Sequence, residues 1–561
     1  MTVRLLPGFV ARVRPAHSTI LGTARMSITS DTTVPGVRDH VGRGLLWLDL
    51  LLLVPAAAVL RLAFFRGGLG TDEVVYLAQA HRLLQGDPGR STYVGAIRYG
   101  INAFDALSVW LFGPGPAGAD GLFFACSLAE VVLAYSFANC LWDRRAAVWS
   151  GIAVAVLPLD VLLATSYNPD CYLALVIAGS VVTFYFAERS NRWTLYLASG
   201  LLAGWVFWIK ESVVIFGLVF VLLALRPGRW RSGYIWFAGG GLLMLAANLL
   251  FFWQIYGDPF YVFNVVRGMV ETVFVKQDTA DTSLGTYFTW LFVKIYHVGL
   301  LGWLGAAAAV LAAKRRDAGA HFVLIWGVGL LALFTVLPIS LSPLKFIAKQ
   351  TNYMEIFLLP FALLAGWFLA RQQRRVAILL GGTMVLAGIL LSAAGQQTVQ
   401  IATADARAAA AFAESQPELP VFGSASVVRQ SMLQHVLRGA PGRQGLIGLE
   451  SGLADLPITS GPAGQIVAYV VDDPQMRYLG HWSSYYSKDD LPPAVRACLI
   501  ADRTLAPAEF GLGRTVVGWA RSVARLLPQT LAVPLLHATD PLWQVAPAQV
   551  YAVTRSCRAQ L

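Results

Sequence analysis

The run WTLYLASGLLAGWVFWIKESVVIFGLVFVLLAL, residues 193–225, decides how this chain folds. Its only charged residues are Lys210 and Glu211. As one α-helix rising about 1.5 Å per residue, the run would be roughly 50 Å long, whereas the hydrocarbon core of a bilayer is roughly 30 Å thick. We therefore expect two short membrane-spanning helices, with Lys210 and Glu211 in the turn between them at the outer surface.

The composition places the whole chain in the same class. It has 561 residues, of which 56% are hydrophobic, and a mean hydropathy of +0.59, too apolar for a soluble protein of this size. Its net charge of +11 does not indicate a nucleic-acid partner, because basic residues gather on the cytoplasmic side of membrane proteins. The sequence lacks G-x-x-x-x-G-K-[ST] and the Rossmann glycine pattern, which argues against nucleotide-driven pumping and against a nucleotide-sugar donor.

Apolar runs of suitable length recur through the first two thirds of the chain. The connections WDRR, ERSNR, RPGRWR, KRR and RQQRR hold thirteen basic residues, and a cytoplasmic N-terminus puts all of them inside, as the positive-inside rule requires. This pattern predicts an all-α polytopic membrane protein with about eleven transmembrane helices and an extracytoplasmic C-terminus. The candidate spans lie near residues 45–64, 119–141, 146–165, 171–187, 193–209, 212–225, 233–255, 287–313, 321–338, 353–370 and 376–394.

The same threading sets the regions around the spans. IRYGINAFDALSVWLFG, residues 97–113, is short and interrupted by Asp105, so we expect a re-entrant or juxtamembrane helix within a long outer loop, residues 66–118. The other predicted regions are a flexible cytoplasmic tail, in which Met26 could be the true start, a transmembrane domain and an extracytoplasmic α/β domain, at residues 1–43, 44–394 and 395–561. In the last of these, LPVFGSASV, GQIVAYVV and AQVYAVT read as strands and SVVRQSMLQHVLRG as a helix.

Cysteine and histidine positions give no sign of a metal site. Cys498 and Cys557 fall in the expected extracytoplasmic region, where a disulfide and two free thiols are both compatible with the sequence. We expect His81 and His297 to be ordinary hydrogen-bonded histidines, because neither has a second ligand at useful spacing. The remaining cysteines lie in or at spans and are expected to be packing residues: Cys126, Cys140 and Cys171.

The outer loop begins with GGLGTDEVVYLAQAHRLL, residues 67–84, which carries the adjacent acids Asp72 and Glu73. A structural interpretation is available. Gly70 or Thr71 could cap a helix, acids in its first turn complement the helix dipole, and an apolar stripe that includes Tyr76 would lie in the membrane interface. The alternative is that the two acids serve a reaction.

Other polar residues map to the same outer face and favour the second interpretation: Arg98, Tyr99, Asp170, Lys210, Glu211, Lys345, Lys349 and Tyr353. Acids and cations at a lipid surface suit a reaction on a lipid-linked phosphate, because cations bind and stabilise a phosphate leaving group. A carboxylate can take the proton from an acceptor hydroxyl. Glycoside hydrolysis normally needs a second carboxyl as general acid, whereas a phosphate leaves without protonation.

Several of these segments, in this order, resemble a known family. They are GLGTDEVVYLAQAHRLLQGD, RYGINAFDALSVWLFG, LPLDVLLATSYNPD, LASGLLAGWVFWIKES, YGDPF and NYMEIFLLPFALLAGW. Together they are similar to the membrane-embedded C-type glycosyltransferases, among them the bacterial relatives of protein O-mannosyltransferases and of the lipid A aminoarabinose transferase. The resemblance covers roughly residues 45–370. Val75 stands where the aminoarabinose transferases carry a basic residue, and RYG replaces a His/Pro-rich segment.

The resemblance implies a C-type glycosyltransferase fold in a bacterial inner membrane and a polyprenyl-phosphate-linked sugar donor. It implies that Asp72 is the catalytic base and that Glu73 supports it. Candidates for the phosphate are Arg98, Lys210, Lys345 and Lys349. Tyr76, Tyr99, Asp170, Glu211 and Tyr353 complete the expected substrate site, although Asp170 could instead cap a helix. The acceptor could be a glycan, a lipid or a protein, and dependence on a divalent metal stays open.

Two other functions compete with this one. A transporter or flippase of lipid-linked sugars would also carry charged residues near the bilayer, but no internal repeat relates the two halves of the sequence. A membrane scaffold whose C-terminal domain binds a partner would leave the acidic outer loop without a role. We expect an enzyme to keep its site in the membrane half when residues 395–561 are deleted, and a scaffold to lose all function.

Overall fold

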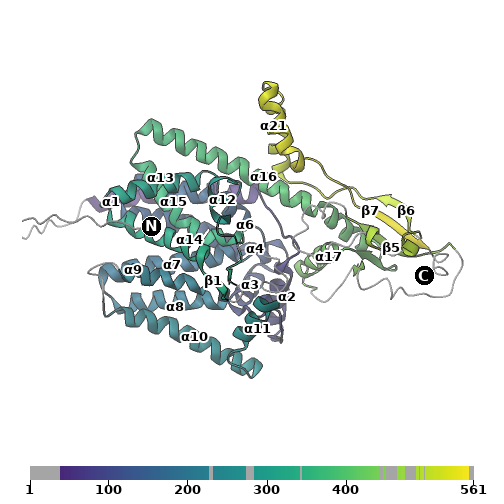
Figure 1. Ribbon diagram of the computed structural model, residues 1–561, viewed down its shortest axis with the longest axis horizontal. Helices are drawn as coiled ribbons and strands as arrows, with labels where there is room; N and C mark the ends of the chain where they lie inside the picture. The colour runs from purple at the N-terminus through teal and green to yellow at the C-terminus, as the bar shows by residue number, and fades with distance from the viewer. Residues whose placement is uncertain are drawn as a thin grey trace, which may run out of the picture. The chain divides into compact units, whose positions relative to one another are not determined.

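The helices of this protein follow the apolar runs of its sequence (Figure 1). The computed structural model describes residues 38–225, 231–272, 283–341, 344–440, 446–449, 464–473, 488–491, 493–497 and 499–554. The predicted pairing of Cys498 with Cys557 lies outside the described residues, as does nearly all of the predicted cytoplasmic tail. The chain divides into two compact units, Met1–Trp47 and Leu48–Leu561. Apart from the first residues of α1, every element described below belongs to the second unit.

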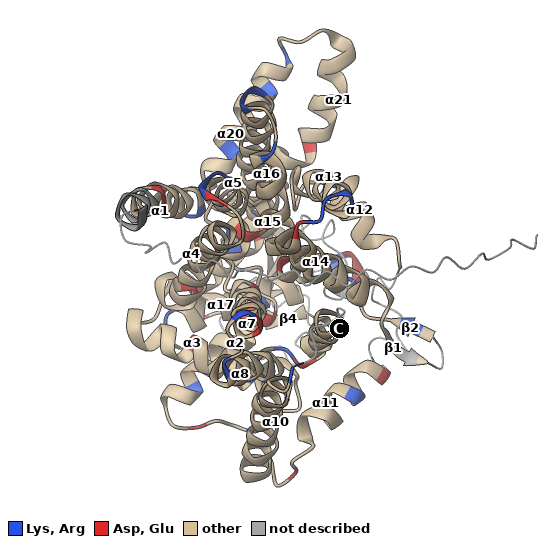
Figure 2. Cartoon of the chain, turned by 90° about the vertical axis from the view of Figure 1, so that its left-hand side faces the viewer, with Lys and Arg blue, Asp and Glu red and all other residues tan. Residues whose placement is uncertain are grey.

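Six described helices are long and apolar enough to cross a membrane. They are α4 (Pro116–Leu141), α7 (Asp170–Ser190), α10 (Tyr234–Tyr256), α14 (Ala318–Val336), η4 with α15 (Asn352–Met354 and Glu355–Ala370) and α16 (Arg374–Glu414). Apolar but shorter are α8 (Trp193–Ile209), η2 with α9 (Glu211–Gly217 and Leu218–Ala224) and α13 (Leu301–Lys314). Figure 2 looks along the helices of the bundle. Most of the length of these helices carries no Lys, Arg, Asp or Glu.

The other helices of the membrane half are α1 (Arg38–Ala63), α2 (Asp72–Leu84), η1 (Gly95–Ile97), α3 (Tyr99–Phe112), α5 (Arg144–Ala155), α6 (Pro158–Leu163), α11 (Tyr261–Met269) and α12 (Thr286–Phe292). Each of the eleven predicted spans is largely helical, but two of them are broken. Residues 146–165 divide before Pro158, which cannot donate a backbone hydrogen bond. Residues 287–313 divide between α12 and α13. The number of crossings therefore stays a prediction.

The run at residues 193–225 folds as its charges predict. α8 ends at Ile209, Lys210 has an extended backbone (φ −156°, ψ 97°), and the 3₁₀ helix η2 begins at Glu211. The predicted juxtamembrane segment is the helix α3, which packs against α2. Both charged residues of the run therefore lie at a break between helices, where they can meet side chains from other loops.

α16 joins the membrane half to the C-terminal half without a linker. It continues for 41 residues, which at about 1.5 Å per residue is roughly 60 Å, about twice the hydrocarbon thickness. The expected boundary near residue 395 therefore falls inside a helix. The side chains of Gln396 and Gln400 donate hydrogen bonds to the carbonyl of Phe65 (2.7 and 3.3 Å), just past the end of α1.

The C-terminal half contains a five-stranded sheet in the order β4-β3-β5-β7-β6. β3 pairs in parallel with β4 and β5, whereas β7 pairs antiparallel with β5 and β6. The last turns of α16 pack on this sheet through a row of alanines. The strands are β3 (Val421–Gly423), β4 (Ile447–Gly448), β5 (Ile466–Asp472), β6 (Leu499–Thr504) and β7 (Gln549–Thr554). Shorter elements are η6 (Lys488–Asp490), α19 (Pro493–Arg496), α20 (Leu512–Ala524), α21 (Gln529–Thr539) and η7 (Asp540–Leu542). A separate hairpin in the membrane half pairs β1 (Pro338–Leu341) with β2 (Leu344–Phe346).

The helix α17 (Ala425–Leu437) brings the C-terminal half onto the outer loop. Leu433, Val436 and Leu437 pack against Val74 and Leu77 of α2 in one apolar cluster. The structural interpretation of α2 as a helix lying on the lipid surface is therefore wrong for its buried face, because α17 and α3 cover it. The C-terminal half thus forms part of the surroundings of the two acids.

Candidate active site

Asp72 is exposed at the start of the outer loop. It is the first residue of α2, and its Oδ1 accepts a hydrogen bond of 2.5 Å from the Tyr93 hydroxyl. Within the described part of the chain, Oδ2 accepts none. Burial, followed by the charge of the Asp72 carboxylate, raises the pKa of the Tyr93 phenol, so Tyr93 stays protonated and donates. The carboxylate is therefore oriented by one oxygen and open to a substrate through the other.

Glu73, in contrast, is buried and turned back into its own loop. Its Oε1 accepts from the backbone N–H groups of Leu69 (2.5 Å) and Gly70 (2.9 Å). Its Oε2 accepts from the Thr71 N–H (2.9 Å) and from the Thr71 hydroxyl. Thr71 itself makes no side-chain capping bond to the helix. Glu73 therefore orders the turn that presents Asp72, and its oxygens are occupied.

The shape of this turn depends on close packing around its glycines. Gly70 has φ +77°, a conformation that favours glycine. A Cβ on Gly68 would lie 2.7 Å from the side chains of Leu433 and Tyr167. Tyr167 also adopts a positive φ of 55°, and its backbone N–H donates to Asp120 Oδ1 at 2.7 Å. Strained residues of this kind cluster at functional sites.

We expect Glu73→Gln to loosen this turn. The amide nitrogen of glutamine would face backbone donors, so at least one buried N–H would lose its acceptor, at a cost of about 1–3 kcal/mol in the free energy of unfolding. Thermal unfolding and hydrogen exchange of residues 67–72 would measure the effect. Asp87→Asn, at an exposed acid of the same loop, is the control. Unchanged exchange in Glu73→Gln would contradict this role.

Next to Asp72, Arg98 is held by an acid from the opening run. Its Nε and Nη2 donate to the two carboxylate oxygens of Glu211 at 2.9 and 2.8 Å, and its Nη1 donates to the Tyr76 hydroxyl at 3.1 Å. Burial works against the Arg98 charge, but Glu211 outweighs it and raises the pKa of the guanidinium. Arg98 and Glu211 therefore form a nearly buried, charge-neutral pair that fixes α3 against the end of α8.

A second pair lies beside the first. Lys210 Nζ is 3.4 Å from Asp170 Oδ1 and 4.1 Å from the centre of the Tyr353 ring. The Asn352 side chain donates to Asp170 Oδ2 at 2.9 Å, so Asp170 orders this cluster; the structure records no capping hydrogen bond at the start of α7. The Tyr353 hydroxyl is 3.4 Å from Ser212 Oγ. The loops that carry Arg98, Asp170, Lys210 and Tyr353 were predicted to share one face of the membrane, and they meet here.

Other predicted residues point elsewhere. Lys349 donates to the carbonyls of Phe334, Thr335 and Ile347 at 2.8–3.0 Å, so its three donors are used at the end of α14. The Tyr99 hydroxyl donates to the carbonyls of Pro88 and Gly89 (3.1 and 3.3 Å) and holds the loop after α2. Lys345 lies half-buried on β2, opposite Ser340. The geometry of Lys349 and Tyr99 indicates structural positions.

Two cations of this site did not emerge from the sequence patterns. Arg66 lies within electrostatic reach of Glu73, Asp170 and Asp120, and its buried Nε has no hydrogen-bond partner. Burial lowers the pKa of Arg66, and the surrounding acids oppose that effect. Arg429 on α17 is exposed, acts electrostatically on Tyr93 and forms no ion pair with a residue that the structure describes. The position of Arg66 directly after a span was the available signal; Arg429 had none.

An apolar groove opens beside this cluster. It has a volume of about 460 Å³, and Glu211 and Ser212 line its polar end. Its walls come from the end of α8, from α11 and from β1, and include Phe207, Val214, Val262, Phe263, Val266 and Ile339. The Arg267–Glu271 ion pair also lines the groove. Apolar walls combined with charged groups suit an amphipathic ligand.

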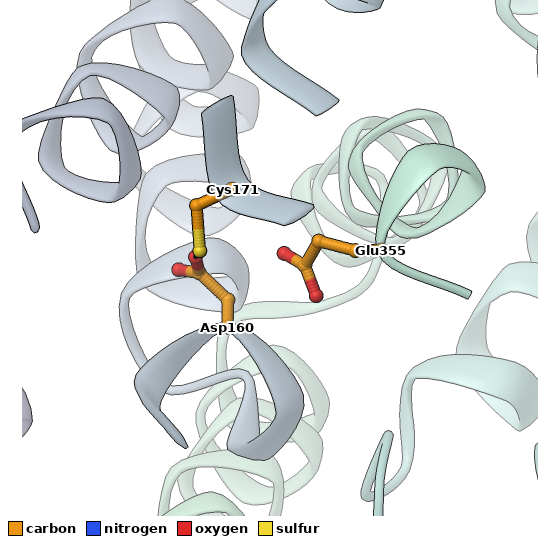
Figure 3. A group of neighbouring side chains, drawn as sticks. All are labelled: Asp160, Cys171 and Glu355. Atoms are coloured by element: carbon orange, nitrogen blue, oxygen red, sulfur yellow. Dashed lines mark hydrogen bonds between the residues drawn. The ribbon is translucent and has the colours of Figure 1, made fainter. Parts of the chain in front are cut away.

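A second, buried cluster lies deeper in the bundle (Figure 3). Ligand atoms of Asp160, Cys171 and Glu355 all lie within 4.8 Å of one another, and Glu355 Oε2 has no hydrogen-bond partner. Two carboxylates and a thiol could hold one divalent cation. However, the guanidinium of Arg61 already binds Asp160, and the Cys171 thiol donates to the same carboxylate at 3.4 Å. Cys171 is therefore more than a packing residue, and Arg61 supplies a positive charge to this cluster.

The remaining predicted cysteines and histidines have simpler environments. Cys126 is buried, as expected of a packing residue, whereas Cys140 is exposed on the surface of α4. His81 Nε2 forms a hydrogen bond of 3.0 Å with the Val436 carbonyl, as expected for an ordinary histidine. His297 packs against the ring of Tyr296, with centroids 4.3 Å apart.

This helical bundle, with an acid-bearing outer loop and a C-terminal region containing a sheet, has the fold of the C-type glycosyltransferases. The structure of ArnT from Cupriavidus metallidurans in the apo state matches with a TM-score of 0.54 at 17% identity, covering 78% of this chain and 94% of that one. ArnT bound to undecaprenyl phosphate matches with a TM-score of 0.51 at 16% identity, covering 79% and 95%. The apo oligosaccharyltransferase of Archaeoglobus fulgidus matches at 0.52 and 12%, covering 92% and 89%.

Sequence comparison points to the same group. The family model described as dolichyl-phosphate-mannose-protein mannosyltransferase matches residues 100–253. A Proteus mirabilis (strain HI4320) protein, undecaprenyl phosphate-alpha-4-amino-4-deoxy-L-arabinose arabinosyl transferase 1, is 22% identical over 327 residues, covering 54% of this chain and 56% of that relative. The match thus spans little more than half of the relative's length. The resemblance to C-type glycosyltransferases related to protein mannosyltransferases and aminoarabinose transferases is confirmed.

Proposed function

We propose that this protein transfers a sugar from a polyprenyl-phosphate donor to a hydroxyl acceptor at the outer face of a bacterial inner membrane. The observation that carries the proposal is Asp72, an exposed carboxylate fixed by Tyr93 and by the Glu73 turn. Asp72 and Arg98 both act electrostatically on Tyr76, and Glu211, the partner of Arg98, lines the groove. The name of one relative, the description of the matching family model and the undecaprenyl phosphate in one related structure support this donor class.

In the proposed reaction Asp72 Oδ2 takes the proton of the acceptor hydroxyl. The acceptor oxygen then attacks the anomeric carbon, and the bond from that carbon to the phosphate oxygen breaks. The polyprenyl phosphate leaves with the electron pair, and Arg66 and Lys210 stabilise its charge. The prenyl chain would enter the groove beside Glu211 and Ser212. Arg429 is positioned to bind the acceptor, because it lies on the Asp72–Tyr93 side of the site.

The proposal is tested with purified protein in proteoliposomes that contain a polyprenyl-phosphate sugar. An enzyme releases polyprenyl phosphate and forms a glycosylated acceptor, which mass spectrometry detects. A flippase moves the donor across the bilayer with its sugar–phosphate bond intact, and that outcome would replace the proposal. The lipid-linked sugar that accumulates in cells lacking this protein would identify the donor.

We expect Arg66→Met to weaken donor binding by about tenfold or more, because a hydrogen bond to a charged partner contributes about 1.5–3 kcal/mol. Binding of the polyprenyl-phosphate sugar to the purified variant measures the effect, and thermal unfolding separates it from a loss of structure. Arg82→Met is the control, since Arg82 pairs with Asp87 at the exposed end of α2. Wild-type donor affinity in a folded Arg66→Met variant would remove Arg66 from the phosphate site.

A further inference from the structure

The hairpin formed by α20 and α21 has an apolar stripe that faces away from the protein. Leu512, Val516, Trp519 and Val523 recur at helical spacing along α20, and Leu526 continues the series in the turn that follows. Three of them are strongly exposed: Trp519 at 69%, Val523 at 59% and Leu526 at 85%. The opposite side carries the arginines Arg514, Arg521 and Arg525.

The start of this hairpin is fixed at the end of a membrane span. The backbone N–H groups of Gly511 and Gly513 donate to the side-chain oxygens of Gln400 and Gln396, each at 2.7 Å. The same two glutamines bind the Phe65 carbonyl, just after α1 ends at Ala63. α20 therefore begins at the level where α1 and the apolar part of α16 both end.

Val516 shows which way the stripe faces. It packs against the same buried cluster, Phe64, Val161 and Ala393, as Leu60 and Ile389, which lie one to two turns inside the spans of α1 and α16. The residues that follow Val516 on the same side of α20 are largely exposed. Figure 1 shows α21 running across the direction of α16 and projecting past the bundle. The exposed stripe thus continues, beyond the protein, a side that begins on membrane-spanning residues.

We propose that the α20–α21 hairpin lies in the membrane interface next to the end of α16, with the stripe in the acyl region and Arg525 among the headgroups. Arg521 pairs with Asp540 at 2.8 Å and Arg514 lies over the rings of Phe510 and Trp543. Arg525 is exposed and is therefore the arginine that can meet the phosphates of a lipid surface. An apolar face opposite basic residues is the pattern of interfacial helices. The hairpin then rests on lipid at the point where the C-terminal sheet joins the bundle through α16.

The proposal is tested by photocrosslinking in nanodiscs, with p-benzoylphenylalanine in place of Val523 or, separately, of Leu526. Arg525 is the matched control, because it is exposed on the opposite side of the same helix end. We expect lipid adducts, detected by mass spectrometry, to exceed those at Arg525 by about fivefold or more. Because the two positions are substituted separately, the test still gives a result if one of the two variants does not fold.

Two outcomes would overturn the proposal. Equal lipid adducts at the stripe and at Arg525 would show that the stripe is not embedded. Crosslinks from Val523 and Leu526 to a protein in native membranes, either a second copy of this chain or another chain, would make the stripe a protein interface. Neither outcome depends on the sugar-transfer activity, so the interfacial hairpin and the proposed function can fail separately.

Discussion

Sugar transfer should fall by at least about 10²-fold in Asp72→Asn, the lower end of the contribution of general base catalysis. Asparagine keeps the side-chain oxygen that accepts from the Tyr93 hydroxyl, so the geometry at the start of α2 is preserved. Only the charge and the basicity are lost. Donor binding should persist, because Arg66 and Lys210 are unchanged. Initial rates from a polyprenyl-phosphate donor, with donor affinity measured beside them, give the comparison.

Asp87→Asn is the matched control for this experiment, since Asp87 is an exposed acid of the same loop paired with Arg82. It should keep near wild-type turnover. If Asp72 only complemented the dipole of α2, its replacement would cost about 0.3–1 kcal/mol of stability and leave turnover intact. A well-folded Asp72→Asn variant with normal turnover would remove Asp72 from the mechanism.

The largest expected loss of stability is at Arg61. Arg61 and Asp160 are both fully buried, and the other Arg61 donors go to Ser127 Oγ (2.5 Å) and to the carbonyls of Ala57 (3.0 Å) and Ala155 (3.2 Å). Arg61→Met would leave buried Asp160 beside another buried acid without its cation. We expect the free energy of unfolding to fall by about 3–5 kcal/mol, the cost of breaking one side of a buried ion pair.

Unfolding of the purified protein in detergent measures this loss, and Arg438→Met provides the comparison. Arg438 pairs with Glu414 while its own side chain is 58% exposed, so its removal should cost about 0–1 kcal/mol. A similar small change in Arg61→Met would show that the buried acids hold protons and need no cation. The two variants therefore separate a charged cluster from a neutral one.

The sequence predicts the elements of this fold better than their ends and partners. Hydropathy places the helices of the predicted spans, because the bilayer requires long apolar runs, but it does not predict α11, α20 or α21. It gives no warning that α16 continues past residue 395, since the alanine-rich turns there pack on a sheet instead of lipid. The strands β3, β5 and β7 are apolar and were predicted. The strand β6, LIADRT, is mostly exposed, so its sequence has no alternating pattern to detect.

The sequence likewise predicts which residues of the site share one face of the membrane, but not which of them pair. Charge and threading assign Asp72, Arg98, Asp170 and Lys210 to one face, and the structure brings their loops together. The pairing of Arg98 with Glu211 is a tertiary contact that no local pattern specifies. Lys349 looked like a phosphate ligand, but it donates to carbonyls whose positions depend on where α14 ends. Arg429 comes from a region with no recognisable motif, and only the packing of α17 on α2 reveals it.

Because α16 is a continuous helix, its length sets the distance between the membrane half and the C-terminal sheet. Glutamines anchor the helix at the level of Phe65, and its last turns carry the sheet. One residue inserted between these anchors would raise the sheet by about 1.5 Å and swing it by about 100°. α17 would then no longer pack on α2, the helix that begins with Asp72. Only an insertion of nearly whole turns, such as seven residues, would keep the sheet facing α2, and it would also need a correspondingly longer outer loop.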